Sequence, residues 1–118
     1  MRADRGLLAM MLTQYIDNAR KYSTAGSPIA VAARASRTEA LISVHSFGSM
    51  IPIEDRERIF ERFYRSAGSK DSVAGTGIGL SVVKKAAEAH HGHVWVVSDA
   101  KEGTTFFLSL PMEPRRTL

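Results

Sequence analysis

The hydrophobic positions in the first part of the chain repeat with the period of an α-helix. They are Leu8, Met11, Leu12, Tyr15, Ile16 and Ala19. This spacing gathers the apolar side chains on one face of a helix that we predict over Arg5–Tyr22, capped by Asp4. Similar periodicity predicts helices over 54–63 and 78–91, and Gly92 stands where a glycine often follows a helix end.

Shorter apolar segments, bounded by turn-forming residues, predict strands. We expect them over 29–35, 40–45, 93–98 and 105–110. Strands mixed with helices in this order predict an α+β fold, a two-layer α/β sandwich in which about three helices cover one face of a mixed sheet.

A stripe of polar side chains interrupts the apolar pattern of the first helix. Gln14, Asn18 and Lys21 are spaced at i, i+4 and i+7, so they share one side of the helix. An amide oxygen and an ammonium group together suit a phosphate chain carrying Mg²⁺. A solvated face without a ligand is the alternative interpretation of this stripe alone.

Three glycines at alternate positions precede the last predicted helix. Gly75, Gly77 and Gly79 let the backbone approach an anion closely, and the N–H groups at a helix start favour negative charge. The run is neither a P-loop nor a dinucleotide fingerprint, because it lacks the Gly-Lys-Ser/Thr ending and follows a polar segment instead of a strand. Alone, it also fits a glycine-rich helix entry without a ligand.

Four motifs in this order resemble the ATP-binding catalytic domain of bacterial sensor histidine kinases, in the GHKL ATPase superfamily. Residues 18–23 resemble its N box, 59–65 its F box, 75–80 its second glycine box, and 103–106 its closing Gly-Thr-Thr-Phe strand. The resemblance extends over nearly the whole chain. It implies Mg²⁺ and ATP as ligands.

The resemblance also assigns roles to individual residues. It implies that Asn18 binds Mg²⁺, Lys21 binds the phosphates, Tyr22 lies beside the adenine and Arg65 reaches the phosphate end. Tyr22 as a core aromatic and Arg65 as an exposed cation are the alternatives, and Phe60 and Phe63 are expected to pack. The other nucleotide-binding candidates are Ser46, Gly48, Ile51, Gly75, Thr76, Gly77, Ile78, Gly79, Leu80 and Thr105.

The first glycine box departs from the family pattern. Ser46 replaces the aspartate that receives the adenine amino group, and Met50 replaces the second glycine. A hydrogen bond to a charged group contributes about 1.5–3 kcal/mol and a neutral one about 0.5–1.5 kcal/mol. We therefore expect ATP to bind up to roughly tenfold more weakly.

Gln14 occupies the position of the glutamate that activates water in family members that hydrolyse ATP. Because an amide cannot accept a proton near neutral pH, we expect binding without efficient hydrolysis. The implied acceptor is a histidine on a separate dimerisation domain, and a response regulator receiver domain is the implied further partner. The alternative is a regulatory protein-interaction module whose nucleotide binding is impaired.

Length and composition limit the remaining possibilities. The 118 residues, 44% of them apolar, predict a single domain over 1–112. Few apolar side chains occur over about 66–74, which predicts a mobile lid there, and we expect a disordered tail over 113–118. The net charge of +4 comes without a nucleic-acid motif, and we expect no nucleic acid and no direct membrane contact. We expect a monomeric, cytoplasmic domain, including where the parent protein is an inner-membrane sensor. The role of His45 is left open.

Overall fold

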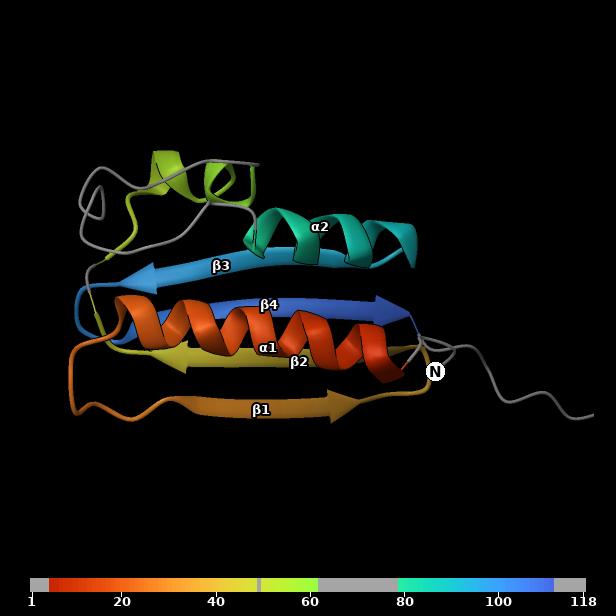
Figure 1. Cartoon of the computed structure of the whole chain (residues 1–118), viewed down its shortest axis with the longest axis horizontal. Coiled ribbons are helices and arrows are strands. Elements are labelled where there is room, and N and C mark those ends of the chain that lie inside the picture. Colours follow the sequence, from red (N-terminus) through yellow and green to blue (C-terminus); the bar gives the residue numbers. More distant parts are fainter. Residues whose placement is uncertain (1–4, 49, 62–78, 112–118) are drawn as a thin grey trace, which may run out of the picture.

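The computed structural model describes residues 5–48, 50–61 and 79–111, in which each α-helix is followed by a pair of strands (Figure 1). The elements are α1 (Arg5–Tyr22), β1 (Ala30–Ala35), β2 (Glu39–Ser46), the 3₁₀ turns η1 (Ile53–Asp55) and η2 (Arg58–Phe60), α2 (Gly79–Ala89), β3 (His93–Asp99) and β4 (Gly103–Pro111). The helix predicted over Arg5–Tyr22 is confirmed over these residues, and its predicted cap, Asp4, lies outside the described residues. Each predicted strand is present, with ends that differ from the prediction by at most two residues.

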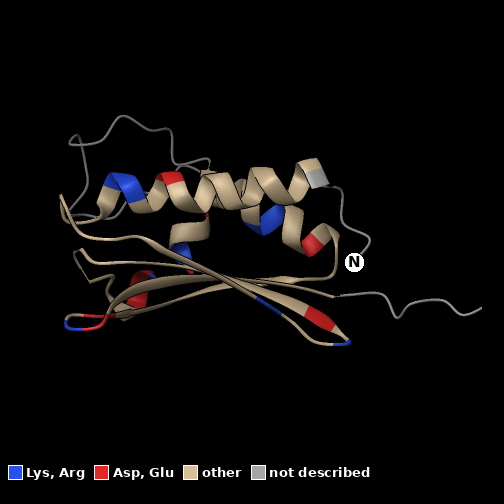
Figure 2. Ribbon diagram, turned by 90° about the horizontal axis from the view of Figure 1, so that it is seen from below, with Lys and Arg blue, Asp and Glu red and all other residues tan. Residues whose placement is uncertain are grey.

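The four strands form one sheet in the order β1-β2-β4-β3. All three strand pairs among the described residues are antiparallel, so the prediction of a mixed sheet is corrected for this part of the chain. A pattern of apolar residues shows that a segment is a strand, but the direction of its neighbour depends on the path of the chain between them. The helices lie on one face of the sheet, which confirms the two-layer sandwich (Figure 2).

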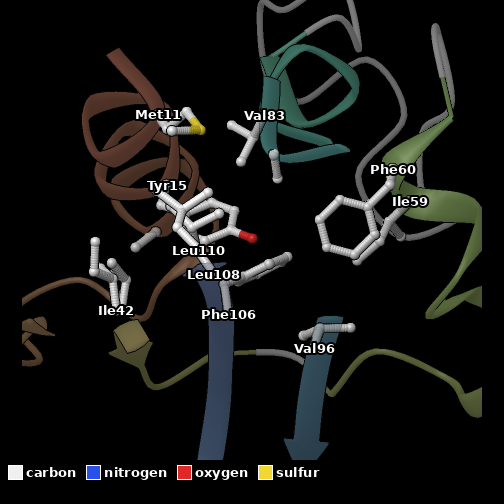
Figure 3. Packing of buried hydrophobic residues seen from close by; sticks show 13 residues of the cluster. Met11, Tyr15, Ile42, Ile59, Phe60, Val83, Val96, Phe106, Leu108 and Leu110 are labelled. Carbon is white, nitrogen blue, oxygen red and sulfur yellow. The ribbon is translucent and has the colours of Figure 1, made fainter. Parts of the chain in front are cut away.

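The core fills the space between α1, α2, η2 and the sheet (Figure 3). Met11, Tyr15 and Ala19 of α1 are buried on the sheet side, as their helical spacing predicted. The Tyr15 ring packs against Phe106 of β4 with ring centroids 5.4 Å apart, and Phe60 contacts Phe106 from η2 at 6.0 Å. Phe60 is therefore a packing residue, as predicted, whereas Phe63 lies outside the described residues.

A helix was predicted over 54–63, but its described part, 54–61, instead takes part in the two 3₁₀ turns η1 and η2. Its conformation follows tertiary contacts. Arg56 donates from Nε to the carbonyl oxygen of Ile51 at 3.2 Å and from Nη2 to that of Ser98 at 2.7 Å. Glu61 then has an extended backbone, which ends η2. These bonds to β3 and the preceding loop favour turns over a continuous α-helix.

The turn between β3 and β4 holds the end of β2 in place. Asp99 Oδ1 accepts hydrogen bonds from the backbone N–H groups of Glu102 and Lys101, which hold the pKa of this carboxyl below its usual value. His45 of β2 donates from Nε2 to the carbonyl oxygen of Glu102 at 2.5 Å. His45, whose role the sequence left open, therefore ties β2 to this turn.

Candidate functional site

The polar stripe of α1 lies beside the buried face of the helix. Gln14 and Asn18 are half-buried and Lys21 is exposed, whereas Tyr15 and Ala19 between them face the core. The side chains of Asn18 and Lys21 are thus available beside the sheet without belonging to the core. An amide oxygen at Asn18 fits a hard cation such as Mg²⁺, and the ammonium of Lys21 fits phosphate oxygens.

The end of α1 is joined to the segment that follows β2. The backbone N–H of Thr24 donates to the carbonyl oxygen of Phe47 at 2.6 Å, and Ser23 forms an isolated bridge with Gly48. A Cβ atom at Gly48 would collide with the backbone carbonyl oxygen of Tyr22, so only glycine allows this approach. The structure therefore brings the last turn of α1 against the first glycine box, two regions about 25 positions apart in the sequence.

Tyr22 is 43% exposed at this junction, which contradicts its alternative interpretation as a core aromatic. Met50 is 48% exposed and Ile51 is half-buried. An exposed aromatic ring suits a planar ligand, since stacking needs an accessible ring face.

A row of hydroxyl groups crosses the helix-facing side of the sheet at the same end. Ser46 of β2 is paired with Thr104 of β4, and Thr104 with Ser98 of β3. The three residues are 6 to 9% exposed, and they continue the apolar row of Val44 and Phe106 at alternate positions. Buried hydroxyls at the end of an otherwise apolar sheet face form a small polar site next to the first glycine box.

The hydroxyl row is linked to the loop that carries Ile51. The backbone N–H of Ile51 donates to Ser98 Oγ at 2.9 Å, and Ser98 Oγ lies 2.7 Å from Thr104 Oγ1. The guanidinium of Arg56 binds the backbone carbonyls of Ile51 and Ser98, as described above. Arg56 and Ser98 therefore fix the loop on the sheet, a role that the sequence alone did not indicate.

Thr105 is separated from the other predicted site residues. It pairs with His45 and Val97 on the face of the sheet that bears no helix. Thr104 lies on the helix-facing side with Ser46, and it is the threonine that joins the candidate site. The alternation of Thr104, Phe106, Leu108 and Leu110 carried this information, because strand residues two apart share a face.

The second glycine box meets α1 at Gln14. A Cβ atom at Gly79, the first residue of α2, would lie 2.5 Å from Gln14 Oε1. Leu80 is partly buried and packs on the core, so it has a packing role here. Gly75, Thr76, Gly77 and Ile78, together with Arg65, the predicted lid and the predicted tail, lie outside the described residues.

Basic side chains mark the end of α1. Arg20 and Lys21 occupy its last turn, both exposed, and they appear as the blue turn of that helix in Figure 2. The hydroxyl row itself contains no charged residue. Cations at the helix end beside a neutral hydroxyl site suit a ligand with an anionic part and an uncharged polar part, as a nucleotide has.

Helices on one face of an antiparallel sheet, with an amide and basic residues joined to a glycine-dependent loop, suit a domain that binds a nucleotide. Residues 3–114 match the family described as "Histidine kinase-, DNA gyrase B-, and HSP90-like ATPase", and the chain belongs to this family. Membership of an ATPase family implies that ATP is the nucleotide.

Similar proteins include sensor kinases of known sequence. The chain is 36% identical over 112 residues to the sensor-like histidine kinase SenX3 of Mycolicibacterium smegmatis, covering 94% of this chain and 29% of SenX3. It is 36% identical over 111 residues to the sensor histidine kinase WalK of Bacillus subtilis, covering 92% of this chain and 18% of WalK. The chain thus spans less than a third of the length of these curated relatives.

Solved structures show the same fold. The mycobacterial sensor histidine kinase MprB superimposes with a TM-score of 0.81 at 29% identity, over 96% of this chain and 75% of that one. Full-length ShkA in complex with AMPPNP superimposes with a TM-score of 0.82 at 28% identity, over 98% of this chain and 23% of ShkA. In the described part of the chain, neither α-helix combines the length and the apolar character that crossing a bilayer requires.

Proposed function

We propose that this chain binds Mg²⁺-ATP and presents its γ-phosphoryl group to a histidine on a separate dimerisation domain. The observation that carries the proposal is the junction of α1 with the first glycine box at Gly48. It places Asn18, Lys21 and Tyr22 at the same end of the molecule as the hydroxyl row. Family membership and the similarity to sensor histidine kinases support it.

The residues have separate roles in this proposal. Asn18 holds Mg²⁺, which when bound offsets phosphate charge, and Lys21 binds the phosphate oxygens. Tyr22, Gly48 and Ile51 line the base site with Ser46, and Arg65 and the glycines of 75–79 complete the phosphate site. In transfer, the acceptor imidazole nitrogen forms a bond to the γ-phosphorus while the bond to the β–γ bridging oxygen breaks and ADP leaves.

Gln14 limits the reaction to transfer. Its Oε1 faces Gly79 at the contact between α1 and α2, and an amide cannot take the proton of an attacking water. A histidine acceptor needs no such base, because its neutral imidazole is itself the nucleophile. We therefore expect phosphotransfer to exceed hydrolysis.

The partners follow from this activity. We propose the acceptor-histidine dimerisation domain of the same kinase and a response regulator receiver domain as partners, with the module on the cytoplasmic side, where ATP is available. The relatives are named as sensor kinases, which supports this assignment.

Calorimetric titration with ATP, with and without Mg²⁺, tests the proposal. We expect Asn18→Ala to abolish the dependence of the ATP Kd on Mg²⁺. Lys21→Ala should weaken ATP binding about tenfold or more, since charge-assisted hydrogen bonds to phosphate are lost. Lys85→Ala, an exposed lysine of α2, is the matched control and should leave the Kd unchanged.

A metal dependence that persists in Asn18→Ala would contradict the ligand assignment. The absence of heat with any nucleotide at millimolar concentration would favour the alternative, a regulatory module that acts through protein contacts. The departures at Ser46 and Met50 are the observations that favour this second candidate.

A further inference from the structure

The hydroxyl row at the end of the sheet can present either a hydrogen-bond donor or an acceptor to a ligand. A carboxylate only accepts hydrogen bonds, whereas a serine or threonine hydroxyl can donate one and accept others. The row of Ser46, Thr104 and Ser98 contains hydroxyls alone. The residue types therefore do not fix whether the row donates a hydrogen bond to a ligand or accepts one from it.

The hydrogen bond between Ser98 and Thr104 can run in either direction, so Thr104 can act toward a ligand as a donor or as an acceptor. Either hydroxyl can be the donor across the 2.7 Å between Ser98 Oγ and Thr104 Oγ1. When Ser98 donates, the Thr104 proton is free to donate to a ligand, and when Thr104 donates, its lone pairs are free to accept. Ser98 Oγ accepts from the backbone N–H of Ile51 in both states, so the loop is held throughout.

Ser46 adds a second adaptable hydroxyl to the row. It is 9% exposed, and among the described residues its side chain makes no hydrogen bond. No buried side-chain oxygen in this part of the chain lacks a partner, so Ser46 Oγ keeps some access to solvent. It is available to an incoming ligand from the side of the first glycine box.

We propose that this chain discriminates weakly between 6-amino and 6-oxo purine nucleoside triphosphates, and that Ser46 and Thr104 determine this selectivity. The inference rests on the proposed nucleotide-binding function and identifies its substrate class more closely. Adenine presents an amino donor at position 6 and guanine or hypoxanthine a carbonyl acceptor, and the hydroxyl row can bond with both. The neutral row suits an uncharged base, whereas the cations of α1 suit the phosphates.

The first test compares the Kd values of ATP, GTP and inosine triphosphate for the unmodified chain, by calorimetry with Mg²⁺. A site of fixed polarity rejects a mismatched partner by roughly 10⁴-fold, so a GTP-to-ATP ratio of Kd values below about thirty supports the proposal and a larger ratio overturns it. Inosine triphosphate should behave as GTP does, because it shares the 6-oxo group and lacks the 2-amino group.

The second test changes the row itself. Ser46→Asp should raise the GTP-to-ATP ratio at least about tenfold, since a carboxylate accepts from the 6-amino group and repels the 6-oxo group. Thr104→Val keeps the shape of the side chain and should weaken both nucleotides by similar factors. Ser43→Ala, on β2 but on the opposite face, is the matched control and should leave all three Kd values unchanged.

Urea unfolding of each variant reports whether the fold is retained. The ratio of the GTP and ATP Kd values for the unmodified chain does not depend on any variant. ATP binding with strong rejection of GTP and inosine triphosphate overturns this inference and leaves the proposed function intact. Failure of all three nucleotides to bind overturns both. An unchanged ratio in a folded Ser46→Asp variant overturns the role of Ser46.

Discussion

Tyr15 shows how one residue serves both the core and the sheet. It is the largest of the fully buried side chains in the described part of the chain, and its hydroxyl donates to the carbonyl oxygen of Phe107 at 2.7 Å. Because the phenol is buried among apolar side chains, ionisation would leave an unsolvated charge. Burial therefore raises the pKa of Tyr15 well above its usual value.

This pKa shift predicts a loss of stability in alkali. Above about pH 10 the unfolded chain releases the Tyr15 proton and the folded protein retains it, so folding then requires proton uptake. The free energy of unfolding should fall by about 1.4 kcal/mol per pH unit from this residue alone, and the effect should be absent below about pH 9.

Urea unfolding of the unmodified chain and of Tyr15→Phe, followed between pH 8 and 11, measures this effect. Near neutral pH the variant should be less stable by about 0.5–1.5 kcal/mol, the usual value of a lost hydrogen bond. The difference should shrink or reverse as the pH rises past about 10. Parallel curves for the two proteins would contradict the assigned burial of the phenol.

At the scale of elements, the end of α2 has an unusual division of roles. His91 has φ of 63° and takes the left-handed position that the sequence assigned to Gly92. Gly92 is needed for space, because a Cβ atom there would collide with the backbone carbonyl oxygen of Ser109 and approach Leu110 Cδ2 at 2.8 Å. Gly92 N–H also donates to the carbonyl oxygen of Ala87 at 2.7 Å.

Opposite effects of two substitutions follow from this division. We expect His91→Gly to raise the free energy of unfolding by about 0.5–1 kcal/mol, because glycine adopts a positive φ without strain. We expect Gly92→Ala to lower it by about 1–3 kcal/mol, because the backbone of β4 cannot move away easily. Thermal and urea unfolding measure both. Destabilisation by His91→Gly would show that the extra freedom of glycine in the unfolded chain outweighs the relief of strain.

The sequence predicted elements with a local cause and missed those with a distant one. Helix α1 was predicted correctly because its apolar period is internal to the segment. The helix predicted over 54–63 was wrong for its described part, 54–61. Arg56 there bonds to Ser98, more than 40 positions away, and no local pattern records that contact. The antiparallel direction of every described strand pair likewise depends on the path of the chain between strands.

The residues of the candidate site likewise fall into those that the sequence motifs predicted and those that depend on distant contacts. The motifs predicted Asn18, Lys21, Tyr22 and Ser46, and the structure brings their elements together at Gly48. Ser98 and Arg56 carry no recognisable motif, because their roles depend on bonds to a loop. The placement of Thr104 could have been predicted from strand alternation, whereas the resemblance to the family directed attention to Thr105.

At the scale of the whole molecule, the two faces of the sheet serve different purposes. The helices and the hydroxyl row share one face, and Trp95 stacks on Phe107 on the other, with ring centroids 5.0 Å apart. Trp95 is the only tryptophan in the chain and is 38% exposed. Its fluorescence therefore reports on the bare face of the sheet, the face that no helix covers.

Nucleotide binding should thus stabilise the protein without changing its tryptophan emission. At a free Mg²⁺-ATP concentration of 100 times Kd, we expect the free energy of unfolding to rise by about 2.7 kcal/mol. The emission maximum of the folded protein should not shift on titration, since the sheet separates Trp95 from the ligand. A saturable shift in the folded state would place the ligand, or a change of structure, on the bare face.

The long axis of the sheet has a practical consequence for attaching this protein to a surface. The turn between β1 and β2, held by the Ser36 hydroxyl, lies at the start of β2, and Ser46 lies at its other end. The eight residues of β2 separate these points by roughly 24 Å. Since the chain has no cysteine, Arg37→Cys would provide a single handle for immobilisation or labelling, far from the nucleotide end. Protein attached to a sensor chip through this cysteine would keep its nucleotide end facing the buffer.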